Sequence, residues 1–210
     1  MYYGVRPMEL WDIAQVSKIE REAFPPPWPA TNFKRELTAN SLTRYLVALK
    51  HSSFAYKHGE NKIEKSRLDT LKSGFTRLFG TIQGEKNTDD EILGFAGVWF
   101  SVDEAHLSNI AVHDDFKGKG VGERLLIAVI DLAVSMNSRF VTLEVRTSNE
   151  AAKCLYRKYD FIEVGLRPGY YMDNKEDALL MTVDMIHSPE YQYRLAERKR
   201  SFSLKWGVHV

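Results

Sequence analysis

Residues 104–122 read EAHLSNIAVHDDFKGKGVG, an apolar strand-like run followed by a loop rich in glycine and lysine. The run at 104–112 follows a second apolar run at 92–100 across a three-residue turn, and the pair predicts an antiparallel hairpin. Beyond the loop, apolar residues recur at helical spacing over 121–136. The stretch therefore predicts a hairpin, an open loop and a helix in direct succession.

The loop Lys117-Gly118-Lys119-Gly120-Val121-Gly122 has the composition of an anion site. Glycines let successive backbone N–H groups turn toward one point without a Cβ in the way. The helix N-terminus adds unpaired donors and a partial positive charge, so we expect the loop to bind a pyrophosphate. A tight turn without a ligand would have a similar composition. A Walker A loop is disfavoured because the Gly-Lys-Ser/Thr ending is missing, and a dinucleotide fold because the loop follows a hairpin.

Helical and strand-like periodicities alternate along the rest of the chain. The expected elements are helices at 7–24, 31–37 and 149–158, and strands at 45–49, 140–145, 161–164 and 178–184. This mixture predicts an α/β (α+β mixed) fold.

The domain organisation follows from two segments that lack this pattern. We expect one domain at 1–186 with an insertion at about 51–90, and a basic C-terminal tail at 187–210. The insertion has scattered charges and weak periodicity, which fits either a disordered excursion or a basic docking surface. The tail starts with Ser188-Pro189-Glu190, a favourable helix start. It fits a solvated helix or frayed end, or a nucleic-acid or ribosome contact.

Composition limits the classes of protein to which the chain can belong. Hydrophobic residues make up 44% and charged residues 27% of the 210 residues, as in ordinary soluble globular proteins. The 29 basic and 28 acidic residues almost balance, so no global field favours nucleic acid or a membrane. One cysteine, no secretory signal pattern and no apolar run of about 20 residues predict a cytoplasmic protein. We expect a monomer or weak dimer, with neither a membrane nor a specific nucleic acid as partner.

One carboxylate stands in an apolar strand pattern. In 141–145, alternation places Val141, Leu143 and Val145 on one face and Thr142 and Glu144 on the other. Glu144 is therefore a candidate general base, unless it meets Arg146 or another base at the end of the sheet. Cys154 has no histidine at local spacing, so we expect a buried structural thiol rather than a nucleophile.

Three motifs in order resemble the GNAT superfamily of N-acetyltransferases, in particular its ribosomal-protein-alanine branch. They are residues 104–122, LEVRTSNEAAKCLYRKYDF at 143–161 and GYYMDNKEDALLM at 169–181. The resemblance covers roughly 5–49 and 92–185. Two positions depart from the family pattern. Lys117 replaces Gln or Arg, keeping the charge without arginine's forked donors, and Asp160 replaces a glycine after the helix, where the left-handed conformation suits glycine better.

The resemblance implies a GNAT fold, with a largely antiparallel central sheet flanked by helices and a splayed pair of cofactor-binding strands. It implies acetyl-CoA as acetyl donor, no metal, Glu144 as general base and Tyr156 as the acid that protonates the departing thiolate. Without it, Tyr156 is a core tyrosine and Asn149 a helix N-cap. The implied coenzyme contacts are Ile110, Ala111, Val112, Lys117, Gly118, Lys119, Gly120, Val121, Gly122, Asn149 and Tyr156. His106 and His113 lack zinc-like spacing to further ligands.

The resemblance also implies a groove for the acceptor, flanked by Phe24, Trp28, Tyr170 and Tyr171. Plain hydrophobic packing of these side chains is the alternative. The predicted function is direct acetyl transfer from acetyl-CoA to an amine, most of all the α-amino group of a protein N-terminus such as an N-terminal alanine of a ribosomal protein. The alternatives are a small-molecule or lysine-side-chain acetyltransferase, or a non-catalytic acyl-CoA-binding, ribosome-associated module.

Overall fold

The computed structural model describes residues 3–24, 30–50, 90–207 and 210. Trp28 and the predicted insertion, apart from Asp90, lie outside them. The described strands form one sheet in the order β1-β2-β3-β4-β5-β7-β6. Their bounds are β1 Tyr3–Pro7, β2 Thr43–Lys50, β3 Glu91–Phe100, β4 Glu104–Val112, β5 Phe140–Arg146, β6 Ile162–Arg167 and β7 Ala178–Val183. Only β4 and β5 run parallel among these strands, so the predicted largely antiparallel sheet is confirmed.

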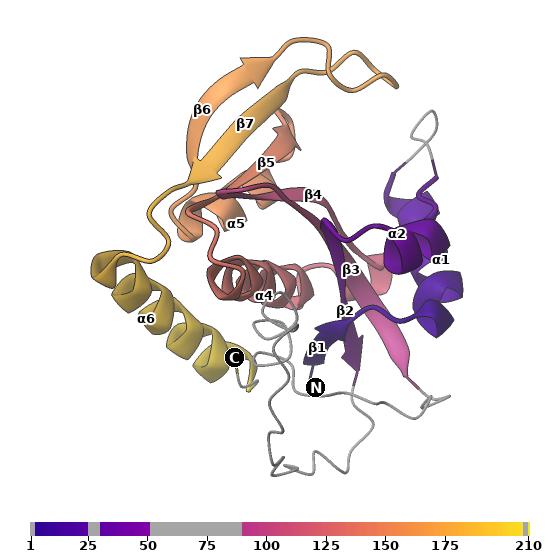
Figure 1. The fold of residues 1–210 in the computed structure, drawn as a ribbon, viewed down its shortest axis with the longest axis horizontal. Helices are drawn as coiled ribbons and strands as arrows, with labels where there is room; N and C mark the ends of the chain where they lie inside the picture. Colours follow the sequence, from indigo (N-terminus) through magenta and orange to yellow (C-terminus); the bar gives the residue numbers. More distant parts are fainter. Residues whose placement is uncertain (1–2, 25–29, 51–89, 208–209) are drawn as a thin grey trace.

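Helices cover both faces of the sheet (Figure 1). One face carries α1 and α2, and the other carries α4, α5 and α6. The helices are η1 Leu10–Asp12, α1 Ile13–Ala23, α2 Phe33–Ala39, η2 Asp114–Phe116, α4 Val121–Ser135, α5 Glu150–Lys158 and α6 Pro189–Trp206. Each face has its own apolar cluster, the larger one around α4.

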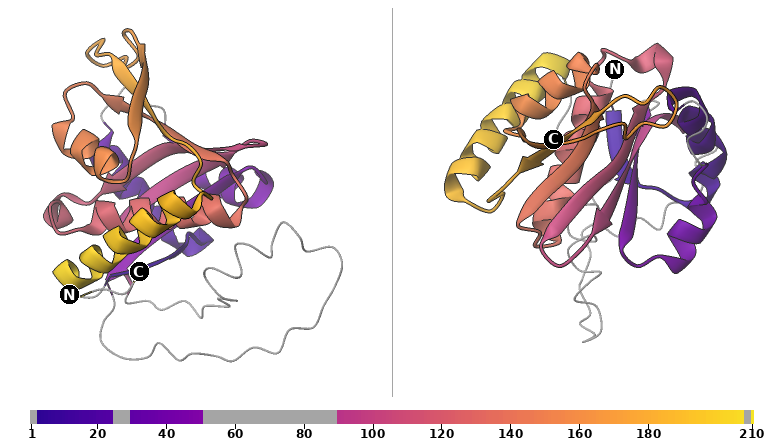
Figure 2. Two further views of the ribbon diagram at one scale, coloured as in Figure 1. Left: turned by 90° about the vertical axis from the view of Figure 1, so that its left-hand side faces the viewer. Right: turned by 90° about the horizontal axis from the view of Figure 1, so that it is seen from above.

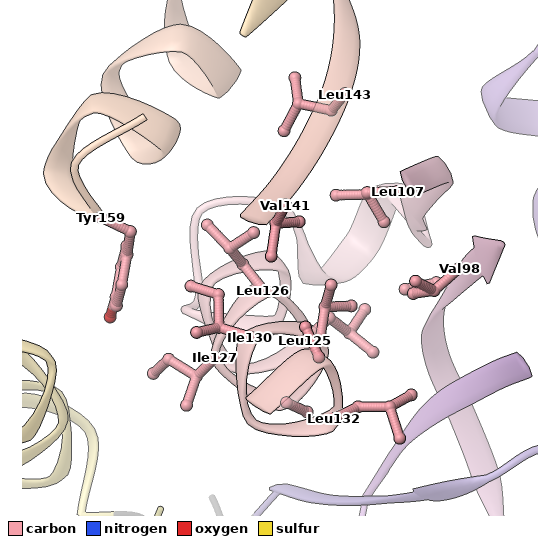
Figure 3. Packing of buried hydrophobic residues seen from close by; sticks show 14 of the residues in the cluster. Val98, Leu107, Leu125, Leu126, Ile127, Ile130, Leu132, Val141, Leu143 and Tyr159 are labelled. Atoms are coloured by element: carbon pink, nitrogen blue, oxygen red, sulfur yellow. The ribbon is translucent and has the colours of Figure 1, made fainter. Parts of the chain in front are cut away.

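Helix α4 lies at the centre of the larger cluster (Figure 3). The sequence pattern placed one apolar stripe on this helix, but Leu126, Ile127 and Ile130 outside that stripe are fully buried as well. A helix that is apolar on nearly all sides must be covered on nearly all sides. The sheet covers one side of α4, and α6 runs along another (Figure 2).

Most of the C-terminal tail, Pro189–Trp206, is therefore a packed helix. Ser188 accepts a hydrogen bond from the Tyr191 backbone at the N-terminus of α6, with Pro189 in the first turn, which confirms the predicted start. Tyr191, Leu195 and Phe202 are buried in the cluster around α4. The helix is thus neither frayed nor fully solvated, because α4 offers it an apolar surface that the tail sequence alone does not reveal.

Three basic residues of α6 make ion pairs with the rest of the domain. Arg194 and Arg198 both reach the Asp160 carboxylate, and Lys199 pairs with Asp131 of α4. Asp160 has a φ of 64°, in the left-handed region that was expected after α5. Three charges of the tail therefore hold it on the domain.

Two sequence predictions are wrong. The chain forms β1 at Tyr3–Pro7 where a helix was expected to begin, and α1 starts only at Ile13. Residues 3–7 form a strand because they pair with β2, some 40 residues away. Local periodicity does not reveal such a pairing. Cys154 is exposed rather than buried, because it lies on the outer side of α5 while Lys153 and Tyr156 face inward.

Candidate active site

The two parallel strands separate halfway along their length. The β4–β5 ladder pairs Glu104–Leu107 with Phe140–Leu143 and ends there. Just beyond, Ser108 is an extra residue in β4, because Gly97 and Val98 of β3 pair with Asn109 and Leu107. This bulge turns β4 away from β5. The splayed strand pair implied by the sequence is thus confirmed.

A pocket lies in this splay. It is lined by residues of β4, β5, α5, the end of α1 and the β6–β7 hairpin: Ala23, Phe24, Leu107, Ser108, Asn109, Ile110, Leu143, Glu144, Val145, Arg146, Asn149, Tyr156, Tyr170 and Tyr171. The structure therefore brings together both predicted catalytic side chains, of which Tyr156 is also a predicted coenzyme contact, two further predicted coenzyme contacts and three predicted acceptor contacts.

Glu144 is the carboxylate of the pocket. The other face of β5 holds Val141, Leu143 and Val145 in the core, as alternation predicted. The Glu144 side chain is only 8% exposed and meets two cationic partners, His106 Nε2 at 3.1 Å and Arg167 at 2.9 Å. The hydrogen bond with His106 lowers the pKa of Glu144, and both cationic side chains add to this effect against burial. The carboxylate is thus ionised at neutral pH.

Tyr156 and Asn149 enter the pocket from α5. Asn149 caps this helix by accepting a hydrogen bond from the Ala152 backbone, which confirms the N-cap prediction. Tyr156 is 4% exposed. Burial raises the pKa of its phenol and nearby Tyr171 adds to the rise, so the phenol keeps its proton at neutral pH.

Two aromatic side chains of the β6–β7 hairpin line the pocket. Tyr170 and Tyr171 make an edge-to-face pair with ring centroids 5.2 Å apart. The Arg146 guanidinium lies 3.8 Å from the Tyr171 ring centroid, while Asp173 and Glu176 hold its nitrogens. Burial raises the pKa of Tyr171 to about 12, so this phenol is neutral too. The wall is thus fixed by cation–π and ionic contacts together.

The glycine-rich loop lies outside the pocket lining, at the far end of β4. Gly118 and Gly120 have φ values of 72° and 85°, which glycine adopts readily. Gly120 is the N-cap of α4, and no side chain caps the start of this helix. Lys117 pairs with Asp114 at 2.5 Å, and Lys119 lies 5.4 Å from the Phe116 ring centroid.

Sequence reasoning did not identify the partners of Glu144. His106 was expected to be a surface or strand residue rather than a metal ligand, and the base expected near Glu144 is Arg167 rather than Arg146. The sequence indicated that His106 shares a strand face with Glu104, two residues earlier. Its contact with Glu144 could not be predicted, because it depends on the parallel pairing of His106 with Thr142. In the described part of the chain, no group of three His, Cys, Asp or Glu side chains could hold a metal ion. No described helix combines the length and apolarity needed to cross a bilayer.

Known proteins resemble this chain along most of its length. The model of the acetyltransferase (GNAT) family matches residues 13–161. A Bacillus subtilis protein assigned as a ribosomal protein bS18-alanine N-acetyltransferase is 33% identical over 180 residues, covering 86% of this chain and 94% of that protein.

Solved structures share the fold. The ribosomal-protein-S18-alanine N-acetyltransferase of Escherichia coli aligns with a TM-score of 0.61 and 24% identity, over 87% of this chain and 94% of that one. Arabidopsis thaliana NAA60 in complex with acetyl-CoA aligns with a TM-score of 0.61 and 16% identity, over 87% and 98%. At these identities the two structures establish the fold alone.

Proposed function

The chain belongs to the acetyltransferase (GNAT) family, whose enzymes use acetyl-CoA, and from this premise we propose that it acetylates the α-amino group of a protein N-terminus. The pocket in the β4–β5 splay carries the proposal, because a carboxylate and a phenol face one space there. The Bacillus subtilis relative is named for the N-terminal alanine of ribosomal protein bS18, so we propose a ribosomal protein as substrate.

The residues of the coenzyme site fit acetyl-CoA. The edge of β4 beyond Leu107 is not paired with β5, which leaves backbone groups near Ile110, Ala111 and Val112 free for the amides of the pantetheine arm. The start of α4, which no side chain caps, and the loop Lys117–Gly122 suit the pyrophosphate. A Cβ added at Gly118 would meet nothing within 4 Å, so the loop is accessible there.

Glu144 takes the proton that the acceptor must lose. A protein N-terminus is largely an ammonium at neutral pH, and its nitrogen can attack only after deprotonation. Acetyl-CoA, when bound, supplies the acetyl group as a thioester. Glu144 first accepts one proton from the ammonium, directly or through water, which frees the lone pair of the nitrogen. As the N–C bond then forms and the C–S bond breaks, Tyr156 supplies a proton to the departing sulfur, and the second proton that the nitrogen loses restores the phenol. The raised pKa of Tyr156 keeps its proton in place until the sulfur departs.

The walls of the pocket favour a narrow acceptor. Phe24 lines the pocket from the end of α1, and Tyr170 and Tyr171 line it from the β6–β7 hairpin. Aromatic side chains offer large apolar contact area at fixed positions, which suits a small first side chain such as alanine. A lysine side chain or a polyamine needs the same two catalytic groups with less demand on these walls. The acceptor class therefore depends on the walls rather than on the chemistry.

The decisive test is mass spectrometry of a peptide library after incubation with acetyl-CoA. Peptides with different first residues should gain the acetyl mass at the α-amino group, with alanine among the best. Matched peptides with a blocked N-terminus and a free lysine, and a polyamine, test the alternative acceptors. Acetylation of these alone would replace the N-terminal proposal with that of a lysine or small-amine enzyme.

The Glu144→Gln variant tests the chemistry. It should retain coenzyme affinity by calorimetry while its kcat falls by about 10²–10⁴-fold, the usual contribution of a general base. Normal turnover would remove Glu144 from the mechanism. Coenzyme binding by the wild type without acetylation of any acceptor would favour a non-catalytic acyl-CoA-binding module.

A further inference from the structure

A row of polar side chains runs from Glu144 away from the pocket. Glu144 Oε2 lies 3.1 Å from His106 Nε2, and Nδ1 of the same ring lies 2.9 Å from Thr142 Oγ1. The Thr142 hydroxyl donates a hydrogen bond to Glu104, whose side chain is 29% exposed. The row thus connects a carboxylate that is nearly buried to one that reaches solvent.

Strand geometry builds this row. Glu104 and His106 are two residues apart on β4, and Thr142 and Glu144 are two residues apart on β5, so each pair shares a face. The parallel register sets His106 opposite Thr142. Four side chains from two strands therefore meet on one surface of the sheet, beside the splay.

The hydrogen bonds determine where the protons of His106 lie. A hydroxyl has one hydrogen, and that of Thr142 goes to Glu104, so Thr142 Oγ1 accepts from Nδ1–H. Nε2 faces the Glu144 carboxylate and donates as well. The ring is thus an imidazolium between two carboxylates. The hydrogen bond with Glu144 raises the pKa of His106, the charges of Glu144 and Glu104 add to the rise, and burial and Arg167 oppose it.

This charge acts directly on the proposed base. A carboxylate held by a cationic ring and by Arg167 is well ordered, but its affinity for an amine proton is low. When His106 loses its Nδ1 proton, through Thr142 and Glu104 to solvent, the ring becomes neutral. It can then still donate from Nε2. Glu144 keeps its orientation and gains proton affinity.

We propose that His106 is a positioning residue for Glu144, whose Nε2–H orients the carboxylate and whose charge, exchanged with solvent through Thr142 and Glu104, sets the basicity of that carboxylate. The inference rests on the proposed acetyl transfer, because it assigns His106 a part in the same deprotonation step. It does not depend on which amine is the acceptor.

The kinetic test compares His106→Gln and His106→Ala. The glutamine amide can still donate to Glu144 but cannot titrate, whereas alanine removes the donor. In the wild type, kcat should rise with pH through a titration above the ordinary histidine value of 6.5, and this rise should be absent from His106→Gln. His106→Ala should lose about 10- to 100-fold in kcat, the loss expected for one hydrogen bond to a charged group, with little change in KM for the coenzyme.

His187→Gln is the matched control, because its ring contacts the Ser138 carbonyl at the other end of β5. It should keep the wild-type profile. Identical pH profiles for His106→Gln and the wild type would overturn the inference, whichever acceptor is used. Unchanged kcat in His106→Ala would do the same.

A second measurement needs no acetyl transfer, so it separates this inference from the proposed function. The ring protons of His106 can be followed by NMR in the free protein as pH is varied. The pKa of His106 should fall in Glu144→Gln and in Thr142→Val, because each variant removes one contact that stabilises the imidazolium. The same pKa in the wild type and both variants would refute the coupling even in a fully active enzyme.

Discussion

The contact between the glycine-rich loop and the C-terminal helix can be tested by adding one methyl group at Gly120. At Gly120, φ is 85°, and a Cβ added there would lie 2.7 Å from Cε2 and 2.9 Å from Cδ2 of Trp206. At Gly118, φ is 72°, and an added Cβ would meet nothing within 4 Å. The two glycines therefore share a left-handed backbone but differ in what faces them. Gly118→Ala is the matched control for Gly120→Ala.

The magnitude follows from two costs. A left-handed alanine costs about 1–2 kcal/mol, and both variants incur this cost. Carbon atoms pack at about 3.5–4.0 Å, so Gly120→Ala must also displace the Trp206 ring, which costs about 1–3 kcal/mol as overpacking. We expect a loss of about 1–2 kcal/mol for Gly118→Ala and about 2–5 kcal/mol for Gly120→Ala. For a chain of this length, the larger loss lowers Tm by about 4–20 °C.

Urea unfolding followed by circular dichroism measures both losses. A double-mutant cycle with Trp206→Ala isolates the contact, because removing the ring should remove the overpacking cost and leave the backbone cost. Equal losses for the two glycine variants would refute the reasoning. So would additive effects of Gly120→Ala and Trp206→Ala.

Three further outcomes follow from the site and its supports. Tyr156→Phe should keep coenzyme affinity by calorimetry but lose about 10²–10⁴-fold in kcat, and normal turnover would exclude the acid role. Asp160→Asn should lower the free energy of unfolding in urea by about 1 kcal/mol, because the ion pairs with Arg194 and Arg198 are lost, and this difference should shrink in 1 M salt. A salt-independent difference would exclude an ionic origin. Glu176→Gln should lower Tm at pH 7, because hydrogen bonds from Ser148 lower the pKa of this carboxyl to about 2. A lowered pKa stabilises the fold above the ordinary value of 4.5, and this stabilisation is lost as pH falls toward about 2, so the two Tm curves should converge there. Parallel curves down to acid pH would contradict the assignment.

Local sequence patterns predicted much of the local structure around the candidate site. Alternation in β5 separated Glu144 from the core side of the strand, and Asn149 and Ser188 marked helix starts that the structure has. These features depend on residues a few positions apart, whose side-chain directions follow from strand and helix periods. The roles given to Glu144 and Tyr156 stay predictions that kinetics must test.

Other features depend on residues far apart in the chain. The strand β1 forms because it pairs with β2, and Cys154 is exposed because of the side that α5 turns toward the sheet. Neither was predicted correctly, since periodicity says which residues share a face and not what covers that face. The packing of α6 on α4 belongs to the same class of feature.

By itself, the amino-acid sequence determined the order of strands and helices around the glycine-rich loop, and its three motifs carried the resemblance to the family. Only the tertiary structure decided which charges surround Glu144, because His106 arrives through parallel pairing of β4 with β5 and Arg167 through the return of the β6–β7 hairpin. It also set Trp206 against Gly120. Backbone periodicity can be recognised from residues that are close in the sequence. The electrostatics of a site depend instead on distances between segments that only folding brings together.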